Sequence, residues 1–424
     1  MKLVKMSLAA IVAAGALSSV ASATPLEEAI KNVDVSGFAR YRYDNTTTNY
    51  TGKNNVGQDE SKGSHRFTSY VDFKAALDDN FYGILGLRYD SKDASGDSDG
   101  RTNVGYQDEG AEDFGQTFNV RQFLLGYQVG NTTIQAGRQV VGTFFTDDMV
   151  GTGIKVLNTD ITGLTLAAVA FDDLQQDPDI GSNSAIILSG AGTPTNPYKF
   201  LKTSDKNLYG VAAIGSYDPV SFQVWYAILQ DITDLYAVEL AVNFDVTEDL
   251  SLGAKAQYAG SNIDGGIKNK PLGTKNVVLD DADFWAIEAT AEGFGVDFSA
   301  GYIDFSADKD KASVISYEDA GSFIKPGEDL LDYTAFFGEN KYWFVTVGYS
   351  FLEKFRVGVD YVDGTQKTAT FKSDNTELVG RASYDYSKKL NFQAWWSHIE
   401  QDKNIEDDVN RETDHFRFQA KYSF

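Results

Sequence analysis

Apolar and polar residues alternate along most of the chain, and the alternation continues to its last residue. From position 416 onward every second residue is aromatic or apolar, namely Phe416, Phe418, Ala420, Tyr422 and Phe424. Because successive side chains of a β-strand point to opposite faces, this segment predicts a strand with one apolar face and one polar face. Strands of a sandwich and strands of a membrane barrel both have this pattern.

The same alternation recurs in earlier segments of about ten residues, at 33–43, 67–77, 343–351, 355–361, 378–386 and 390–396. Strands of this length and polarity are typical of a transmembrane β-barrel, and a final strand that ends in Phe resembles the assembly signal of bacterial outer-membrane barrels. Residues 119–129 are less regular, because Arg121 has the same phase as Phe123 and Leu125. That segment predicts either an arginine above the lipid or a β-bulge.

Short and long connections alternate between these segments. Short turns are predicted at 78–80, 130–131, 160–163, 218–219, 245–249, 292–293, 353–354 and 387–389. Longer polar loops are predicted at 44–64, 91–117, 141–151, 172–206, 231–234, 260–283, 306–339, 363–375 and 401–410. Seventeen connections predict an all-β fold, a transmembrane antiparallel β-barrel of about 18 strands with both chain ends on the periplasmic side.

The first residues read as an export signal. Met1–Ala23 has a basic start, an apolar middle and a small-residue cleavage site after Ala23, which predicts a secretory signal peptide. The mature barrel domain is then 24–424, and its start predicts either a short helix at Pro25–Lys31 or an unstructured tail. No later stretch has 18 consecutive apolar residues, so no transmembrane helix is expected.

Composition removes several classes of function. The chain has no cysteine, which excludes a disulfide scaffold, a thiol catalyst and a Cys-ligated metal site. Its 61 acidic and 37 basic residues argue against nucleic acid as a partner. The motif at Gly96–Gly100 lacks the strand and helix of a nucleophile elbow, and His65, His398 and His415 are far apart in sequence. We therefore expect no enzyme and no required cofactor.

A barrel of 18 strands is wide enough to enclose an aqueous channel. The inward faces of the segments above are polar and charged, so we expect the interior to hold water instead of a packed core. This predicts a diffusion porin that passes ions and small hydrophilic solutes.

Four segments carry a specific resemblance: TPLEEAIKNVDVSGFARYRYD at the mature start, VGTGIKV at 150–156, ITGLTLAA at 161–168 and KLNFQAWWS at 389–397. They resemble the Campylobacter-type (epsilonproteobacterial) major outer membrane porin family over the whole mature chain. The resemblance implies an eighteen-stranded general porin in the outer membrane, assembled as a homotrimer, with one loop folded into the pore.

The third external connection, Val141–Gly151, is the candidate constriction loop. It carries Asp147 and Asp148 and no basic residue. Inward-phased arginines of the first three strands are the candidates for the opposite wall: Arg40, Arg42, Arg66 and Arg88. Acids facing bases would create a field across the pore. The simpler alternative is that these arginines are solvated lumen residues at scattered heights.

The charge predicts mild cation selectivity, since loss of Lys2 and Lys5 with the leader makes the net charge of −24 more negative by two. Carboxylates could also hold Ca²⁺ at the pore mouth, and the candidates are Asp147, Asp148, Asp177 and Asp179. A solvated acidic loop is the alternative. Divalent ions could further bridge loop carboxylates to the phosphates of lipopolysaccharide, which with the membrane lipid is an expected partner.

Two other functions fit the same barrel. A substrate-specific channel for a sugar or another small solute would need aromatic side chains along the lumen, and Trp395 and Tyr70 have the inward phase. A surface adhesin built on the exposed loops could coexist with a channel. A plugged transporter is not expected, because few residues precede the first strand.

Overall fold

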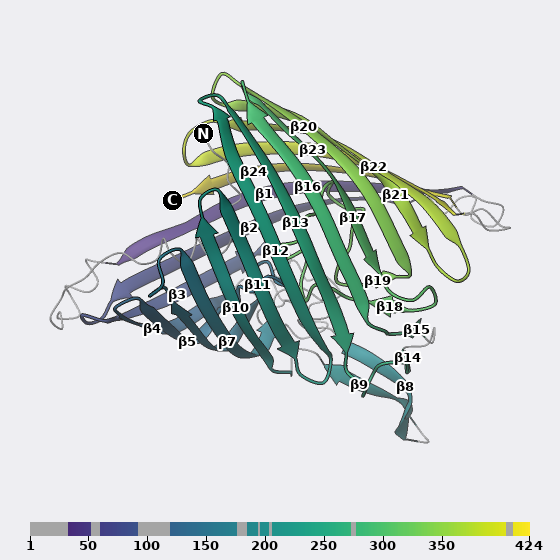
Figure 1. Ribbon diagram of the computed structural model, residues 1–424, viewed down its shortest axis with the longest axis horizontal. Helices are drawn as coiled ribbons and strands as arrows, with labels where there is room; N and C mark the ends of the chain where they lie inside the picture. Colours follow the sequence, from purple (N-terminus) through teal and green to yellow (C-terminus); the bar gives the residue numbers. More distant parts are fainter. Residues whose placement is uncertain are drawn as a thin grey trace.

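The computed structural model describes residues 33–51, 60–91, 119–175, 185–193, 196–202, 206–272, 277–403 and 410–424. Eighteen strands form one closed antiparallel sheet, which confirms the predicted β-barrel (Figure 1). The predicted signal peptide and the segment Pro25–Lys31 lie outside the described residues. Within the described ranges, no helix has the length and apolar character needed to cross a membrane.

The barrel strands follow one another around the wall in chain order. The first seven are β1 (Asp34–Thr51), β2 (Glu60–Ala76), β3 (Phe81–Asp90), β4 (Asn119–Val129), β5 (Thr132–Val140), β6 (Val150–Asn158) and β7 (Leu164–Gln175). The next six are β10 (Leu208–Tyr217), β11 (Val220–Leu229), β12 (Thr233–Thr247), β13 (Leu250–Ile263), β16 (Ala282–Gly293) and β17 (Val296–Ser306). The last five are β20 (Glu339–Phe351), β21 (Phe355–Lys367), β22 (Lys372–Asp385), β23 (Leu390–Lys403) and β24 (Asn410–Ser423).

The barrel closes between its first and last strands. β1 pairs with both β2 and β24, and Gly37 and Phe424 exchange two backbone hydrogen bonds of 3.1 Å. Closure pairs the backbone groups that an open sheet edge would expose, and hydrocarbon offers those groups no other partner. The alternating segment at the end of the chain is therefore the strand that completes the barrel.

Short turns and longer connections alternate around the barrel as predicted, except that the connections at 230–232 and 368–371 are as short as the turns. One turn is displaced by two residues, because β16 continues through Gly293 and the chain reverses at Phe294 and Gly295. Both turn residues have positive φ, 54° and 79°. This left-handed pair matches the twist of the flanking strands, and glycine adopts it without strain.

Three longer connections contain strands that are not part of the barrel. β8 (Ala185–Thr193), β9 (Asn196–Lys202), β14 (Pro271–Leu272) and β15 (Val277–Val278) form one small sheet. Figure 1 shows these four gathered beyond the ends of β12, β13 and β16. β18 (Ala312–Ser313) pairs with β19 (Phe336–Phe337) within the connection between β17 and β20.

The outward faces are apolar, as the alternation predicts. In β24, Phe416 is 40% exposed and Tyr422 is 45% exposed, since both point away from the barrel interior. Aromatic rings at the short-turn end lie in a row across the last five strands: Tyr349, Phe351, Phe355, Tyr384, Phe392 and Phe418. A girdle of aromatic side chains at a membrane interface is typical of outer-membrane barrels.

A bulge in β4 explains the irregular phase of Arg121. The register against β3 shifts between Gly86 and Leu87, which pair with Gln122 and Val120. The extra residue on β4 is Arg121, whose side chain is 7% exposed and does not face the lipid. Of the two predictions for this segment, the bulge is therefore the one that holds.

Candidate functional site

Residues 141–149, here called the short inner loop, connect β5 to β6 and fold into the barrel. The backbone closes on itself through a 2.8 Å hydrogen bond from Val141 N to Met149 O. Four apolar side chains of this loop are at most 1% exposed: Val141, Phe144, Phe145 and Met149. A loop whose apolar side chains are this deeply buried must have a partner inside the barrel.

That partner is the connection between β17 and β20, residues 307–338, here called the long inner loop. Its backbone donates hydrogen bonds from Tyr317 N to Phe145 O and from Ser322 N to Phe144 O, at 2.9 and 2.8 Å. The rings of Phe323 and Phe144 meet edge to face with centroids 4.9 Å apart. The two inner loops therefore form a single packed unit.

One side of the barrel wall supports this unit. The inward faces of β7, β10 to β13, β16, β17 and β20, here called the apolar sector, contribute buried residues that include Leu208, Trp225, Ala237, Ala259, Phe284, Phe305 and Phe344. The Tyr317 hydroxyl bonds to Ala227 O and Leu229 N, both at 3.1 Å. The expectation that water fills the whole interior is therefore wrong, because this side is a hydrophobic core.

The opposite side of the wall is charged. The inward faces of β21 to β24 and β1 to β3, here called the charged sector, carry Arg356, Asp360, Arg381, His415, Arg417, Lys421, Arg40, Arg42, Asp44, Arg66, Arg88 and Asp90. The four predicted arginines are thus all on this side. Because charged side chains need water or charged partners, we expect the aqueous path to run along this side.

The four predicted arginines differ in their surroundings. Arg66 Nε and Arg88 Nη2 lie 2.7 and 3.1 Å from Asp90 Oδ2, a carboxylate that is 1% exposed. Arg42 Nη2 donates a 3.0 Å bond to an amide, Gln419 Oε1, and Arg40 lies over the Phe38 ring at 5.5 Å. Neither Arg40 nor Arg42 has an ion pair with a carboxylate among the described residues.

The predicted acid pair lies at the lumen surface of the short inner loop. Asp148 Oδ2 is 3.4 Å from the Tyr70 hydroxyl, and the Asp148 carbonyl accepts a 3.2 Å bond from Arg121. The Arg121 guanidinium also lies over the Tyr70 ring at 4.6 Å. The acid pair therefore adjoins β2 and β4, beside the arginine strands. Although Asp147 reaches lumen water, enclosure by the protein and then Asp148 raise the pKa of its carboxyl.

Sequence reasoning missed the lumen edge of the long inner loop. Glu328 Oε1 lies 2.6 Å from Arg381 Nη1, and Asp329 Oδ2 lies 2.7 Å from His415 Nδ1. Burial raises the pKa of the Glu328 carboxyl, and the Arg381 charge opposes that rise. The signal in the sequence was the run of apolar residues in this connection, which a solvent-exposed loop would not need: Val314, Ile315, Phe323, Ile324, Leu330, Leu331 and Phe336.

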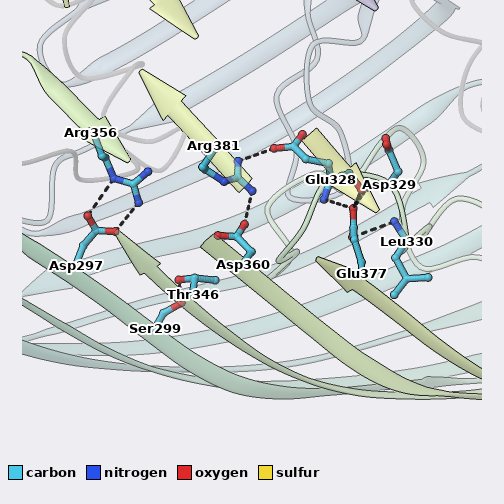
Figure 2. Close-up of polar contacts among 11 residues, drawn as sticks. Asp297, Ser299, Glu328, Asp329, Leu330, Thr346, Arg356, Asp360, Glu377 and Arg381 are labelled. Carbon is cyan, nitrogen blue, oxygen red and sulfur yellow. Dashed lines mark hydrogen bonds and ion pairs between the residues drawn. The ribbon is translucent and has the colours of Figure 1, made fainter. Parts of the chain in front are cut away.

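Charges of the wall strands form an alternating row that leads to this edge. Figure 2 shows Arg356 bonded to Asp297, and Arg381 placed between Asp360 and Glu328. Because each arginine has a carboxylate partner, this part of the charged sector is neutralised internally.

Two buried carboxylates bind the inner loops to each other and to the barrel wall. Glu318 of the long inner loop is 0% exposed, and its Oε2 accepts hydrogen bonds from the backbone N of Asp147 and Met149 at 3.1 and 2.7 Å. On the wall, Glu377 of β22 is also 0% exposed and accepts bonds from the long inner loop. Both side chains are bonded to loop amides instead of facing passing solutes.

The calcium candidates are not brought together in the part of the chain that is described. Asp177 and Asp179 lie outside the described residues, and Asp147 and Asp148 are adjacent in the short inner loop. Within the described ranges, no group of three or more His, Cys, Asp or Glu side chains could hold a metal ion.

A comparison with protein families matches the Campylobacter major outer membrane protein family over residues 1–424. The chain belongs to this family. The resemblance noted in the sequence is thereby confirmed, as is the location in the bacterial outer membrane. A comparison with curated proteins finds no match.

Among solved structures, Acinetobacter baumannii OccAB2 is similar with a TM-score of 0.66 and 14% identity, over 92% of this chain and 98% of that one. Pseudomonas aeruginosa OccD3 (OpdP) is similar with a TM-score of 0.65 and 13% identity, over 92% of this chain and 91% of that one. Pseudomonas aeruginosa OccK2 (OpdF), solved in complex with glucuronate, is similar with a TM-score of 0.63 and 13% identity, over 92% of this chain and 98% of that one. At this identity the likeness shows the fold. Family and fold together make the protein an outer-membrane porin channel, in contact with the membrane and with small solutes.

Proposed function

We propose that this porin passes ions and small hydrophilic solutes by diffusion, with a mild preference for cations, and that it has no enzymatic activity. The observation that carries the proposal is the position of Asp147 and Asp148 on the lumen side of the short inner loop, against Tyr70 and Arg121. A carboxylate at a narrow passage attracts cations more strongly than one in bulk water, because the surrounding protein lowers the effective dielectric constant.

The same geometry explains why the preference would be mild. Arg40 and Arg42 line the charged sector without a carboxylate partner among the described residues, so they attract anions toward the wall. Asp147, Asp148 and these two arginines are the proposed constriction, with Arg66 and Arg88 held by Asp90. Opposing charges partly cancel for an ion on the axis and leave a field across the pore.

Planar-bilayer recording of the purified protein in a KCl gradient tests the proposal. We expect stable open channels. Their reversal potential should have the sign that shows potassium to be more permeant than chloride. Stable channels with a chloride preference would contradict the cation preference, and failure to form stable open channels would contradict diffusion through an open pore.

A second candidate is a channel that prefers organic anions. It is favoured by the guanidinium groups of Arg40 and Arg42, which suit carboxylates and have no carboxylate partner in the part of the chain that is described, and by the glucuronate complex of the structurally similar OccK2. Liposome swelling with glucuronate and glucose, which have similar size, separates the two candidates. Equal rates support simple diffusion, whereas much faster swelling with glucuronate supports the anion channel.

The remaining proposals concern partners. We propose a homotrimer in contact with outer-membrane lipid and lipopolysaccharide, and Ca²⁺ held in the pore by Asp147 and Asp148 together with Asp177 and Asp179. Mass measurement of the detergent-solubilised protein tests the trimer. Calorimetric titration with CaCl₂, with the Asp147→Asn and Asp148→Asn double variant as control, tests the metal.

A further inference from the structure

The lumen edge of the long inner loop is bonded to one carboxylate of the barrel wall. Glu377 Oε1 accepts hydrogen bonds from the backbone N of Glu328 and Asp329, both at 3.0 Å, and Oε2 accepts one from Leu330 N at 3.3 Å. Figure 2 shows these three consecutive amides converging on the Glu377 side chain. Converging backbone amides form an anion-binding concavity, and here the bound anion is a side chain of the protein itself.

The wall supports the carboxylate from the other side. Ser397 on the neighbouring strand β23 is 0% exposed and donates a 2.6 Å hydrogen bond to Glu377 Oε1. Because Glu377 is also fully buried, its charge has no access to water and depends on these four donors. A small displacement of the loop that kept the site closed to water would leave this charge with Ser397 as its one remaining donor, so the docked position is favoured over partly released ones.

The loop is shaped to receive this carboxylate. Gly327 has a φ of +75°, which disfavours residues with a side chain, and a Cβ at this position would lie 2.1 Å from Glu377 Oε2. The backbone therefore approaches the carboxylate more closely than any other residue type would allow. The fit is local and specific, in contrast to the broad apolar contact that holds the rest of the loop.

The hydrogen bonds to Glu377 position two acidic residues of the loop. The next two residues, Glu328 and Asp329, extend to Arg381 on β22 and to His415 on β24. The His415 ring also lies 3.2 Å from Asp44 on β1. The anchored segment therefore places two carboxylates against the charged sector, where the aqueous path runs.

We propose that Glu377 is a positioning residue of the channel, which fixes the lumen edge 327–330 and thereby sets the width and the steadiness of the pore. The anchor acts through the loop and touches no solute. The inference needs an open channel, and it does not depend on the cation preference proposed above.

The test compares three variants in single-channel recordings. Glu377→Gln keeps the side-chain volume but removes the charge and turns an NH₂ group toward the loop amides. Loss of even one hydrogen bond to a charged group changes the ratio of docked to released loop by about tenfold or more. We expect additional sub-conductance steps and greater open-channel noise. Ser397→Ala removes one neutral donor and should show a weaker form of the same change.

Asp297→Asn is the matched control. It removes the same unit of lumen charge from the pair with Arg356, and neither residue of that pair is bonded to an inner loop. The control therefore reports the effect of charge alone and should conduct as steadily as the parent protein. The chain has no cysteine, so a spin label on Lys325→Cys reports loop mobility directly.

Current noise and spin-label mobility together test the role of Glu377. Greater current noise and greater label mobility in Glu377→Gln, with neither in Asp297→Asn, supports the anchor. A Glu377→Gln protein that matches the control in both measurements overturns it. If Glu377→Gln does not assemble a barrel, as judged by heat-modifiable migration on gels, the same two measurements on Ser397→Ala take its place. Greater noise and mobility than in Asp297→Asn then support the anchor, and equality with Asp297→Asn overturns it.

Discussion

The apolar sector and the charged sector are built from strands that obey the same alternation but differ in what they turn inward. In the apolar sector both faces are hydrophobic, as in β11, where Trp225 and Ala227 are buried while Val224 and Tyr226 are exposed. In the charged sector the inward residues are arginines and carboxylates, as in β1. The outward face is dictated by lipid, so the inward face alone decides whether a stretch of wall binds a loop or lines water.

This division gives the channel an off-centre path. Hydrophobic burial, a non-directional force, holds the inner loops against one wall. Individual ion pairs and carboxylate anchors hold the free edge of the loops against the other wall. Burial therefore stabilises the packed part of the loops, whereas specific hydrogen bonds set the position of their edge.

The largest effect is expected from Phe323→Ala in the long inner loop. The Phe323 ring contacts Phe144 and Phe284 at centroid distances of 4.9 and 4.7 Å, and its loss from a closed core costs about 3–5 kcal/mol. We expect a lower thermal unfolding midpoint and a higher conductance as the loops loosen. Phe123→Ala, on the lipid face and 68% exposed, is the control. Equal behaviour of the two variants would show that no core holds the loops.

The next effect is electrostatic and has opposite signs on the two sides of the water path. The double variant Asp147→Asn and Asp148→Asn should weaken the cation preference, and Arg40→Gln with Arg42→Gln should strengthen it. One charge about 8 Å from an ion changes its energy by about 0.5 kcal/mol in water, so two charges change the local concentration of that ion about fivefold. Reversal potentials in a KCl gradient measure both. If both double variants shifted the reversal potential in the same direction, the acids and the arginines would not form a common constriction.

A smaller effect follows from pH. Because enclosure raises the pKa of Asp147 and of Glu328, both carboxyls take up protons at a higher pH than ordinary carboxyls do. As the pH falls, the negative charge is lost, so the cation preference should begin to decline above the usual carboxyl range of about 4. Reversal potentials over a pH series show this. A decline that begins only below that range would contradict the role of these two groups.

The smallest effect is expected at the short-turn end of the barrel, where Asp297 of β17 pairs with Arg356 of β21 in the charged sector. The ion pair of Asp297 and Arg356 is partly exposed, with side chains that are 38% and 30% accessible. Pairs of this kind contribute at most about 1 kcal/mol, so Asp297→Asn should leave the unfolding midpoint nearly unchanged. A loss as large as that of Phe323→Ala would mean that the charged sector also carries the stability of the barrel.

The sequence was sufficient for the barrel because lipid requires an apolar side chain at every second position, and strands with a polar inward face show this as a period of two. It predicted the strand count, the bulge alternative at Arg121 and the inward phase of Arg40 and Arg42. The long inner loop could not be found in this way, because a strand that is apolar on both faces, such as β11, has no clear period. Glu377 could not be separated from solvated lumen acids, since its buried position depends on a loop about 50 residues earlier in the chain.

In the proposed channel, water follows the charged sector while the apolar sector is closed by the inner loops. Single cysteines in this cysteine-free chain test it, with Arg42→Cys on the charged side and Ala237→Cys, at a position 1% exposed, on the apolar side. A charged thiosulfonate reagent is added to open channels in a bilayer. We expect a stepwise change in current for Arg42→Cys and none for Ala237→Cys. Modification of Ala237→Cys with no response of Arg42→Cys would contradict it.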